Sequence, residues 1–122
     1  MFDPTHTKLN HSQKVFTAVQ WRQLLQNSKT RPEGAKPVVK LFNPMGAATW
    51  LLTECDEDGI AFGLCDLGMG FPELGYVCIP EIVELFTNSR GRRWIERDLH
   101  FKASKTLAEY ADEAREKQRI IA

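Results

Sequence analysis

The sequence lacks a surplus of charge of either sign, a long hydrophobic run and a paired-cysteine motif. Its 122 residues carry 16 basic and 16 acidic side chains, so the formal net charge is zero. A neutral chain has no overall attraction for nucleic acid or for an anionic membrane surface. Nucleic acid would need a local patch, for which Arg90, Arg92 and Arg93 are the candidates. No apolar run reaches membrane-spanning length, so we expect no membrane partner.

Cysteine is scarce, and its spacing forms no known motif. Cys55, Cys65 and Cys78 are odd in number, contain no C-x-x-C pair, and lie in or beside apolar runs. This pattern predicts buried free thiols in a reducing compartment, and no spacing in the chain reaches the specificity of a metal or cofactor motif. The opening residues, MFDPTHTKLNHSQ, are polar and lack the apolar core of a secretory leader. We therefore expect a cytoplasmic protein without a cofactor.

What is present is the composition of one globular domain, with 43% hydrophobic and 26% charged residues. Residues 1–15 contain few apolar groups and no periodicity, so we expect a disordered or loosely docked segment. Residues 16–122 are predicted to form a single α+β domain. Its first helix opens at Thr17, which has the spacing of a capping box with Gln20. We expect residues 27–28 to end that helix.

Five segments are rich in β-forming residues, and turn-forming residues separate the first four. They are 38–42, 49–54, 60–65, 76–79 and 94–102. A short apolar helix is expected over 80–88, and a last amphipathic helix is expected from about Ser104.

These elements predict a five-stranded, mainly antiparallel meander sheet. We expect the N- and C-terminal helices to cover one face of the sheet and the short helix after the fourth strand to cap one end. A small, strongly curled half-barrel of the same strands is the alternative. The meander requires that the first strand pair with the second.

The loop between the third and fourth strands is the candidate binding surface. Residues 67–75, LGMGFPELG, combine three glycines with a proline, which predicts a loop of fixed shape. A strand follows and the loop holds no cation, so a phosphate-binding loop is not indicated. Apolar tips on a rigid loop are typical of a protein-binding surface. The candidate contact residues are Asp66, Met69, Phe71 and Glu73.

The fifth predicted strand carries the candidate catalytic residues. Period two places Glu96, Asp98 and His100 on one face, where two carboxylates and an imidazole could ligate a metal or transfer protons. The alternative is the solvated outer face of a one-sided antiparallel sheet.

Arg97 lies on the other, apolar face of that strand. A buried guanidinium needs an acceptor, because an unpaired buried charge is very costly. We predict that Arg97 is buried and bonded to Asp66, to Glu73 or to carbonyls of residues 66–75. Such a bond would hold the loop of residues 67–75 against the last strand, which makes Arg97 a fifth candidate binding residue.

Three stretches resemble a known family. VVKLFNPMGAATWLLTE, IAFGLCDLGMGFPELGYV and IERDLHF are similar to an uncharacterised bacterial family, a domain of unknown function found largely on plasmids and conjugative elements. The resemblance extends from about Thr17 to the end. It implies carriage on a mobile element, often near antirestriction genes, and it brings no established activity.

Two functions of different class follow from these observations. The first is a small non-catalytic protein-binding accessory factor of a mobile genetic element, with counter-defence as one role, whose partner is a host or plasmid-encoded protein. The second is a metal-assisted hydrolase or nuclease that uses Glu96, Asp98 and His100. The sequence names neither the partner nor the oligomeric state.

Overall fold

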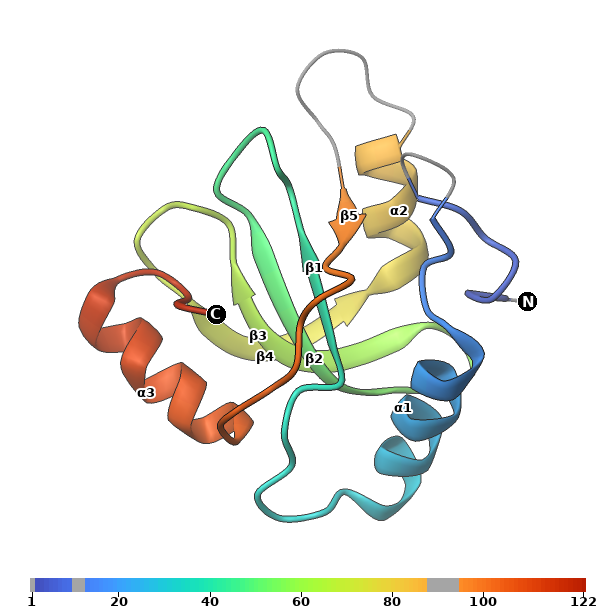
Figure 1. The fold of residues 1–122 in the computed structure, drawn as a ribbon, viewed down its shortest axis with the longest axis horizontal. Coiled ribbons are helices and arrows are strands. Elements are labelled where there is room, and N and C mark those ends of the chain that lie inside the picture. Colours follow the sequence, from blue (N-terminus) through green and yellow to red (C-terminus); the bar gives the residue numbers. More distant parts are fainter. Residues whose placement is uncertain (1, 10–12, 88–94) are drawn as a thin grey trace.

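An antiparallel sheet forms the centre of the fold (Figure 1). The computed structural model describes residues 2–9, 13–87 and 95–122. The sheet has five strands in the order β4-β3-β2-β1-β5. The first strand pairs with the second, with Val39 opposite Leu52 and Phe42 opposite Thr49, so the predicted meander is confirmed. The strand bounds are β1 Val39–Phe42, β2 Thr49–Cys55, β3 Ile60–Asp66, β4 Glu73–Cys78 and β5 Glu96–Arg97.

Two strand boundaries differ from the prediction by more than two residues. β4 starts at Glu73, which lies opposite Cys65, so the central loop is shorter than expected. β5 ends at Arg97, whereas a strand to residue 102 was expected. The cause is Asp98, whose carboxylate accepts a hydrogen bond from the His100 backbone N–H at 2.9 Å. An aspartate that bonds its own backbone two residues on stabilises a turn, and this turn ends the strand.

The helices are α1 Ala18–Thr30, α2 Ile79–Thr87 and α3 Leu107–Lys117. The capping box of Thr17 and Gln20 is confirmed. However, α1 does not end at residues 27–28. Asn27 is buried, and its side-chain N–H donates to the Thr53 carbonyl at 2.9 Å. This bond to β2 replaces the local bonds by which asparagine usually interrupts a helix.

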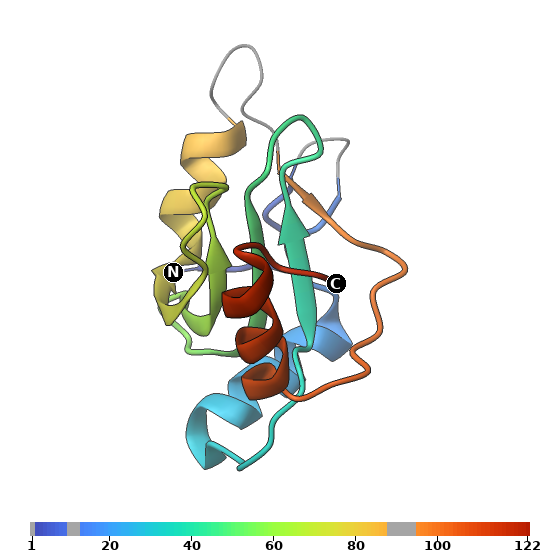
Figure 2. The ribbon, with the colours of Figure 1, turned by 90° about the vertical axis from the view of Figure 1, so that its left-hand side faces the viewer.

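The helices cover both faces of the sheet, which corrects the expectation of one covered face. Leu24 of α1 and Val83 of α2 pack in one apolar cluster with Leu52. Leu51, the neighbouring residue in β2, points to the opposite face and packs against Tyr110 of α3. Figure 1 shows α3 on one side of the sheet, with α1 and α2 on the other, and Figure 2 shows α3 in front of the strands.

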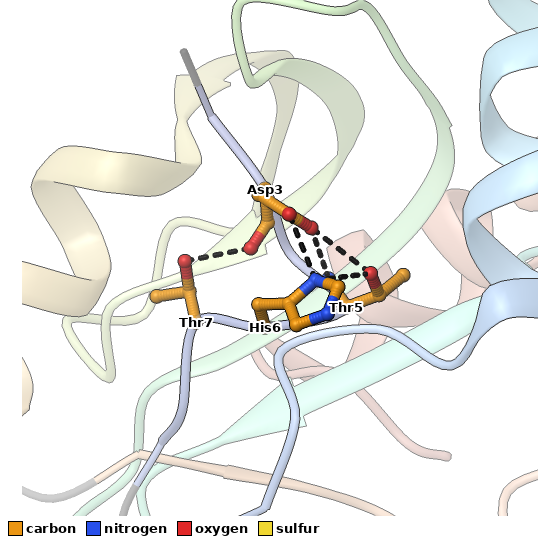
Figure 3. Close-up of polar contacts among 4 residues, drawn as sticks. All are labelled: Asp3, Thr5, His6 and Thr7. Atoms are coloured by element: carbon orange, nitrogen blue, oxygen red, sulfur yellow. Dashed lines mark hydrogen bonds and ion pairs between the residues drawn. The ribbon is translucent and has the colours of Figure 1, made fainter.

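The described part of the N-terminal segment lies against the face that carries α1. Phe2 packs edge-on against Trp21 at 5.7 Å between ring centroids, and Leu9 is buried. The segment turns at Asp3, whose carboxylate accepts hydrogen bonds from Thr5 and lies 2.8 Å from the His6 ring nitrogen (Figure 3). The hydrogen bond from the Thr5 hydroxyl lowers the pKa of the Asp3 carboxyl. Loose docking of this segment in solution stays a prediction.

Among the helices that the structure describes, none is both long enough and apolar enough to span a membrane.

Candidate functional site

The side chain of Asp66 holds the start of the central loop, residues 67–72, in place. This buried residue ends β3, and one of its carboxylate oxygens accepts the Gly68 backbone N–H at 2.8 Å. The other oxygen accepts the backbone N–H of Ile120, 3.0 Å away in the C-terminal tail. One carboxylate therefore fixes both the start of the loop and the tail that follows α3. Asp66 supports the candidate surface and is not exposed on it.

Two glycines set the path of the loop. Gly68 has φ of +82°, and a Cβ there would lie 2.6 Å from the Cβ of Ala47, in the turn between β1 and β2. Only glycine permits both this conformation and this close approach. Gly70 has φ of +84°, but a Cβ there would meet no atom within 4 Å. The loop is thus held against the β1–β2 turn at Gly68, while its tip projects into open space at Gly70.

The loop presents three large apolar side chains to solvent. Leu67, Met69 and Phe71 are 60%, 70% and 78% exposed, and we refer to these three residues as the loop surface. They line a hollow of about 260 Å³ together with Cys65 and Glu73. The structure therefore brings the predicted residues Met69, Phe71 and Glu73 together.

A second hollow adjoins the first at Leu67. It measures about 280 Å³ and lies between α2 and the sheet. Its apolar walls include Ile82 and Phe86 of α2, and Phe86 packs edge-on against Trp50 at 5.4 Å. Leu67 and the α2 residues are not among the binding residues predicted from the sequence. The available signal was the wide apolar face of α2, which Ile82, Val83, Leu85 and Phe86 share opposite the polar face of Glu81 and Glu84.

Arg97 is buried, as predicted, but its predicted partners are wrong. Its guanidinium donates to the Lys14 carbonyl, in the segment before α1. Strand register explains the difference, because Asp66 lies opposite Thr49 and hence on the face that carries α3, away from Arg97. Glu73 lies on the same face as Arg97 but four strand positions away, a distance of roughly 19 Å. Arg97 therefore does not hold the central loop.

Glu96, Asp98 and His100 do not form the expected row, because the strand that was to align them ends at Arg97. Asp98 lies 3.3 Å from the Lys40 ammonium group, and His100 is exposed in the turn. The part of the chain that the structure describes contains no group of three or more His, Cys, Asp or Glu residues placed to hold a metal. Arg90, Arg92 and Arg93 lie outside the described residues.

All three cysteines are free thiols, but the prediction that they are buried is confirmed for Cys55 alone. Cys55 is buried, whereas Cys65 and Cys78 are half-buried. Burial raises the pKa of Cys55 to about 12 and that of Cys65 to about 11. Since the thiolate is the nucleophile, the raised pKa lowers the reactivity of these two thiols at neutral pH.

The fold and the loop surface define a small α+β protein. Its most prominent feature is an exposed apolar loop on a sheet whose two faces are both covered by helices. The chain matches the model of the family described as "Protein of unknown function (DUF2958)" over residues 15–121, and it belongs to that family. No curated protein and no solved structure shows significant similarity to the chain.

Proposed function

We propose that the protein is a small non-catalytic accessory factor that binds a host or plasmid-encoded protein through the loop surface. The observation that carries this proposal is the exposure of Leu67, Met69 and Phe71 on a backbone held by Asp66 and Gly68. A fixed loop loses little conformational entropy on binding, so its apolar area converts efficiently into affinity. The adjoining hollow beside α2 extends the same apolar area.

The cellular setting is a second part of the proposal. Carriage on a mobile element, with counter-defence as one role, comes from the sequence resemblance described above. Its test is the gene neighbourhood of family members. Plasmid or conjugation genes should lie beside the genes of family members more often than beside chromosomal genes of similar size.

Capture from a host lysate tests the binding surface. Immobilised protein should retain one host or plasmid-encoded protein, and Phe71→Ala should weaken retention of that same protein at least tenfold. Val19→Ala is the matched control, because Val19 is 71% exposed but lies on α1. Equal retention by the wild type and Phe71→Ala would contradict the proposal.

The hydrolase alternative is tested by titration with Mg²⁺ or Mn²⁺. Binding of about one ion per chain that is abolished by His100→Ala would favour an enzyme that uses Glu96, Asp98 and His100. We expect no saturable binding, because Asp98 pairs with Lys40 and its carboxylate also accepts the His100 backbone N–H.

A further inference from the structure

β4 is an edge strand of the sheet, and its sequence does little to prevent pairing with another strand. Within the described residues, no strand pairs with its outer side. Natural proteins usually guard such an edge with proline, lysine, a bulge or a very short strand. β4 is six residues long, ELGYVC, has neither proline nor lysine, and keeps an unbroken register with β3. The opposite margin, β5, has only two residues. β4 is therefore a ready template for another strand.

The hydrogen bonds of the neighbouring residues show which groups of β4 point outward. The backbone N–H of Ile79, directly after β4, donates to the Gly59 carbonyl on the β3 side at 2.9 Å. Bonding direction alternates with every residue along an antiparallel strand, so every second residue before Ile79 also bonds toward β3. Of the residues between them, Leu74 and Tyr76 direct both backbone groups to the open edge. Cys78 directs its N–H there, while its C=O lies at the start of α2 and serves the first turn of that helix.

We propose that β4 pairs antiparallel with β4 of a second copy of this chain, about a two-fold axis at Tyr76. In this register Tyr76 faces Tyr76 of the other copy, and Leu74 faces Cys78 of the other copy. The two Tyr76 residues then exchange two backbone hydrogen bonds, and each Cys78 N–H donates to the Leu74 carbonyl of the other copy, which gives about four bonds. The two sheets become one continuous antiparallel sheet.

The side chains of β4 favour a second copy over a different strand. In the two-fold register, the apolar side chains of one β4 lie opposite the apolar side chains of the other. Leu74 and Tyr76 are 42% and 58% exposed on the face that carries α3. Tyr76 already packs against Phe62 at 4.9 Å between ring centroids, and the axis would continue this row of rings into the other copy. The Glu73 carboxylates would lie about 20 Å apart. A formal net charge of zero adds no overall repulsion.

The dimer is independent of the proposed binding partner. It uses the edge of β4, whereas the proposed function uses the loop surface, and each has its own measurement. Loss of the dimer with retained partner capture, or the reverse, separates the two.

Sedimentation velocity and light scattering on the full chain test the pairing. We expect the wild type to have the mass of two 13.9 kDa chains. Tyr76→Asp and Tyr76→Lys should each be monomeric, because the axis places like charges opposite each other. An equimolar mixture of the two variants should restore the dimer, since Asp then faces Lys.

Val19→Asp and Val19→Lys are the matched controls on α1 and should remain dimeric. Amide exchange offers a measurement without substitution, in which Tyr76 and Cys78 of the wild type should exchange slowly. A monomeric wild type with fast exchange at these amides overturns the proposal. Dimeric Tyr76 variants, or variants that do not recombine, overturn the two-fold pairing at Tyr76, and protection that appears only with a host protein assigns the edge to a foreign strand.

Discussion

Arg97 joins the end of β5 to the segment before α1 through both its backbone and its side chain. Its backbone N–H donates to the Gln13 side-chain oxygen at 2.9 Å, and its guanidinium donates to the Lys14 carbonyl. We predict that Arg97→Met lowers the free energy of unfolding by about 1–3 kcal/mol, because a part-buried carbonyl loses its donor. Urea denaturation measures the loss.

The matched control is Arg115→Met, in which an exposed arginine loses its pairing with Asp112. Exposed pairs of this kind contribute little, so its midpoint should barely move. Amide exchange in the central loop should be unchanged in Arg97→Met, because Arg97 lies across the sheet from that loop. Faster exchange there would contradict the placement of Arg97.

The raised pKa values of Cys55 and Cys65 predict how stability depends on pH. An unfolded thiol has a pKa of about 8.5, whereas the folded value is about 12 for Cys55 and about 11 for Cys65. Between these values the unfolded chain binds fewer protons than the folded chain, so the free energy of unfolding falls as pH rises. The full contribution is present below about pH 8.5 and is lost progressively above it.

Urea midpoints measured between pH 7 and pH 10 should therefore decline for the wild type. Cys55→Ala should decline less steeply, because one of the two groups no longer titrates. Parallel curves for the two proteins would show that Cys55 does not contribute to the slope.

At the scale of elements, Asp66 couples the central loop to the tail after α3. We predict that Asp66→Asn destabilises the protein by about 1–3 kcal/mol, because the amide nitrogen cannot accept one of the two backbone N–H groups. Amide exchange at Gly68 and Ile120 should become faster, since these are the two donors. Asp58→Asn makes the same chemical change at an exposed turn and should leave both amides unchanged. Unaltered exchange at both positions in Asp66→Asn would refute the coupling.

Most limits set by neighbouring residues could be predicted from the sequence, and the exception is the turn at Asp98 that ends β5. The capping box at Thr17 and the turn between β1 and β2 depend on residues within a few positions, and both are confirmed. Limits set by distant partners could not be predicted. α1 continues past Asn27 because of a bond to Thr53, and Asp66 bonds Ile120, which is 54 positions away. No local pattern encodes either contact.

For the candidate site, the residues that are close in the sequence could be grouped in advance, whereas those brought together by the fold could not. Met69, Phe71 and Glu73 lie within one short stretch, so the sequence was enough to group them around one hollow. Leu67 joins that hollow to the one beside α2, and this requires the packing of a helix on the sheet. The row of Glu96, Asp98 and His100 failed because period two applies only while the strand continues.

At the scale of the whole molecule, β2 contributes to both apolar clusters of the core, one on each face of the sheet. Leu51 and Leu52 are adjacent and both fully buried, one in each apolar cluster. A run of apolar residues without alternation is typical of a strand covered on both faces. The run TWLLTEC fits that pattern, and it explains why one helix at each end of the chain can cover a different face.

The N-terminal segment adds to the cluster that contains α1, although it precedes the residues that match the family. Leu9 is buried there, and its backbone N–H donates to the Gln13 carbonyl at 2.6 Å. We predict that Leu9→Ala lowers the free energy of unfolding by about 2–3 kcal/mol, as a leucine removed from a packed core does. Val19→Ala, at an exposed position of α1, should change it by less than about 0.5 kcal/mol. Urea denaturation of both variants decides the matter, because equal midpoints would mean that the segment is loosely docked in solution, as its composition predicts.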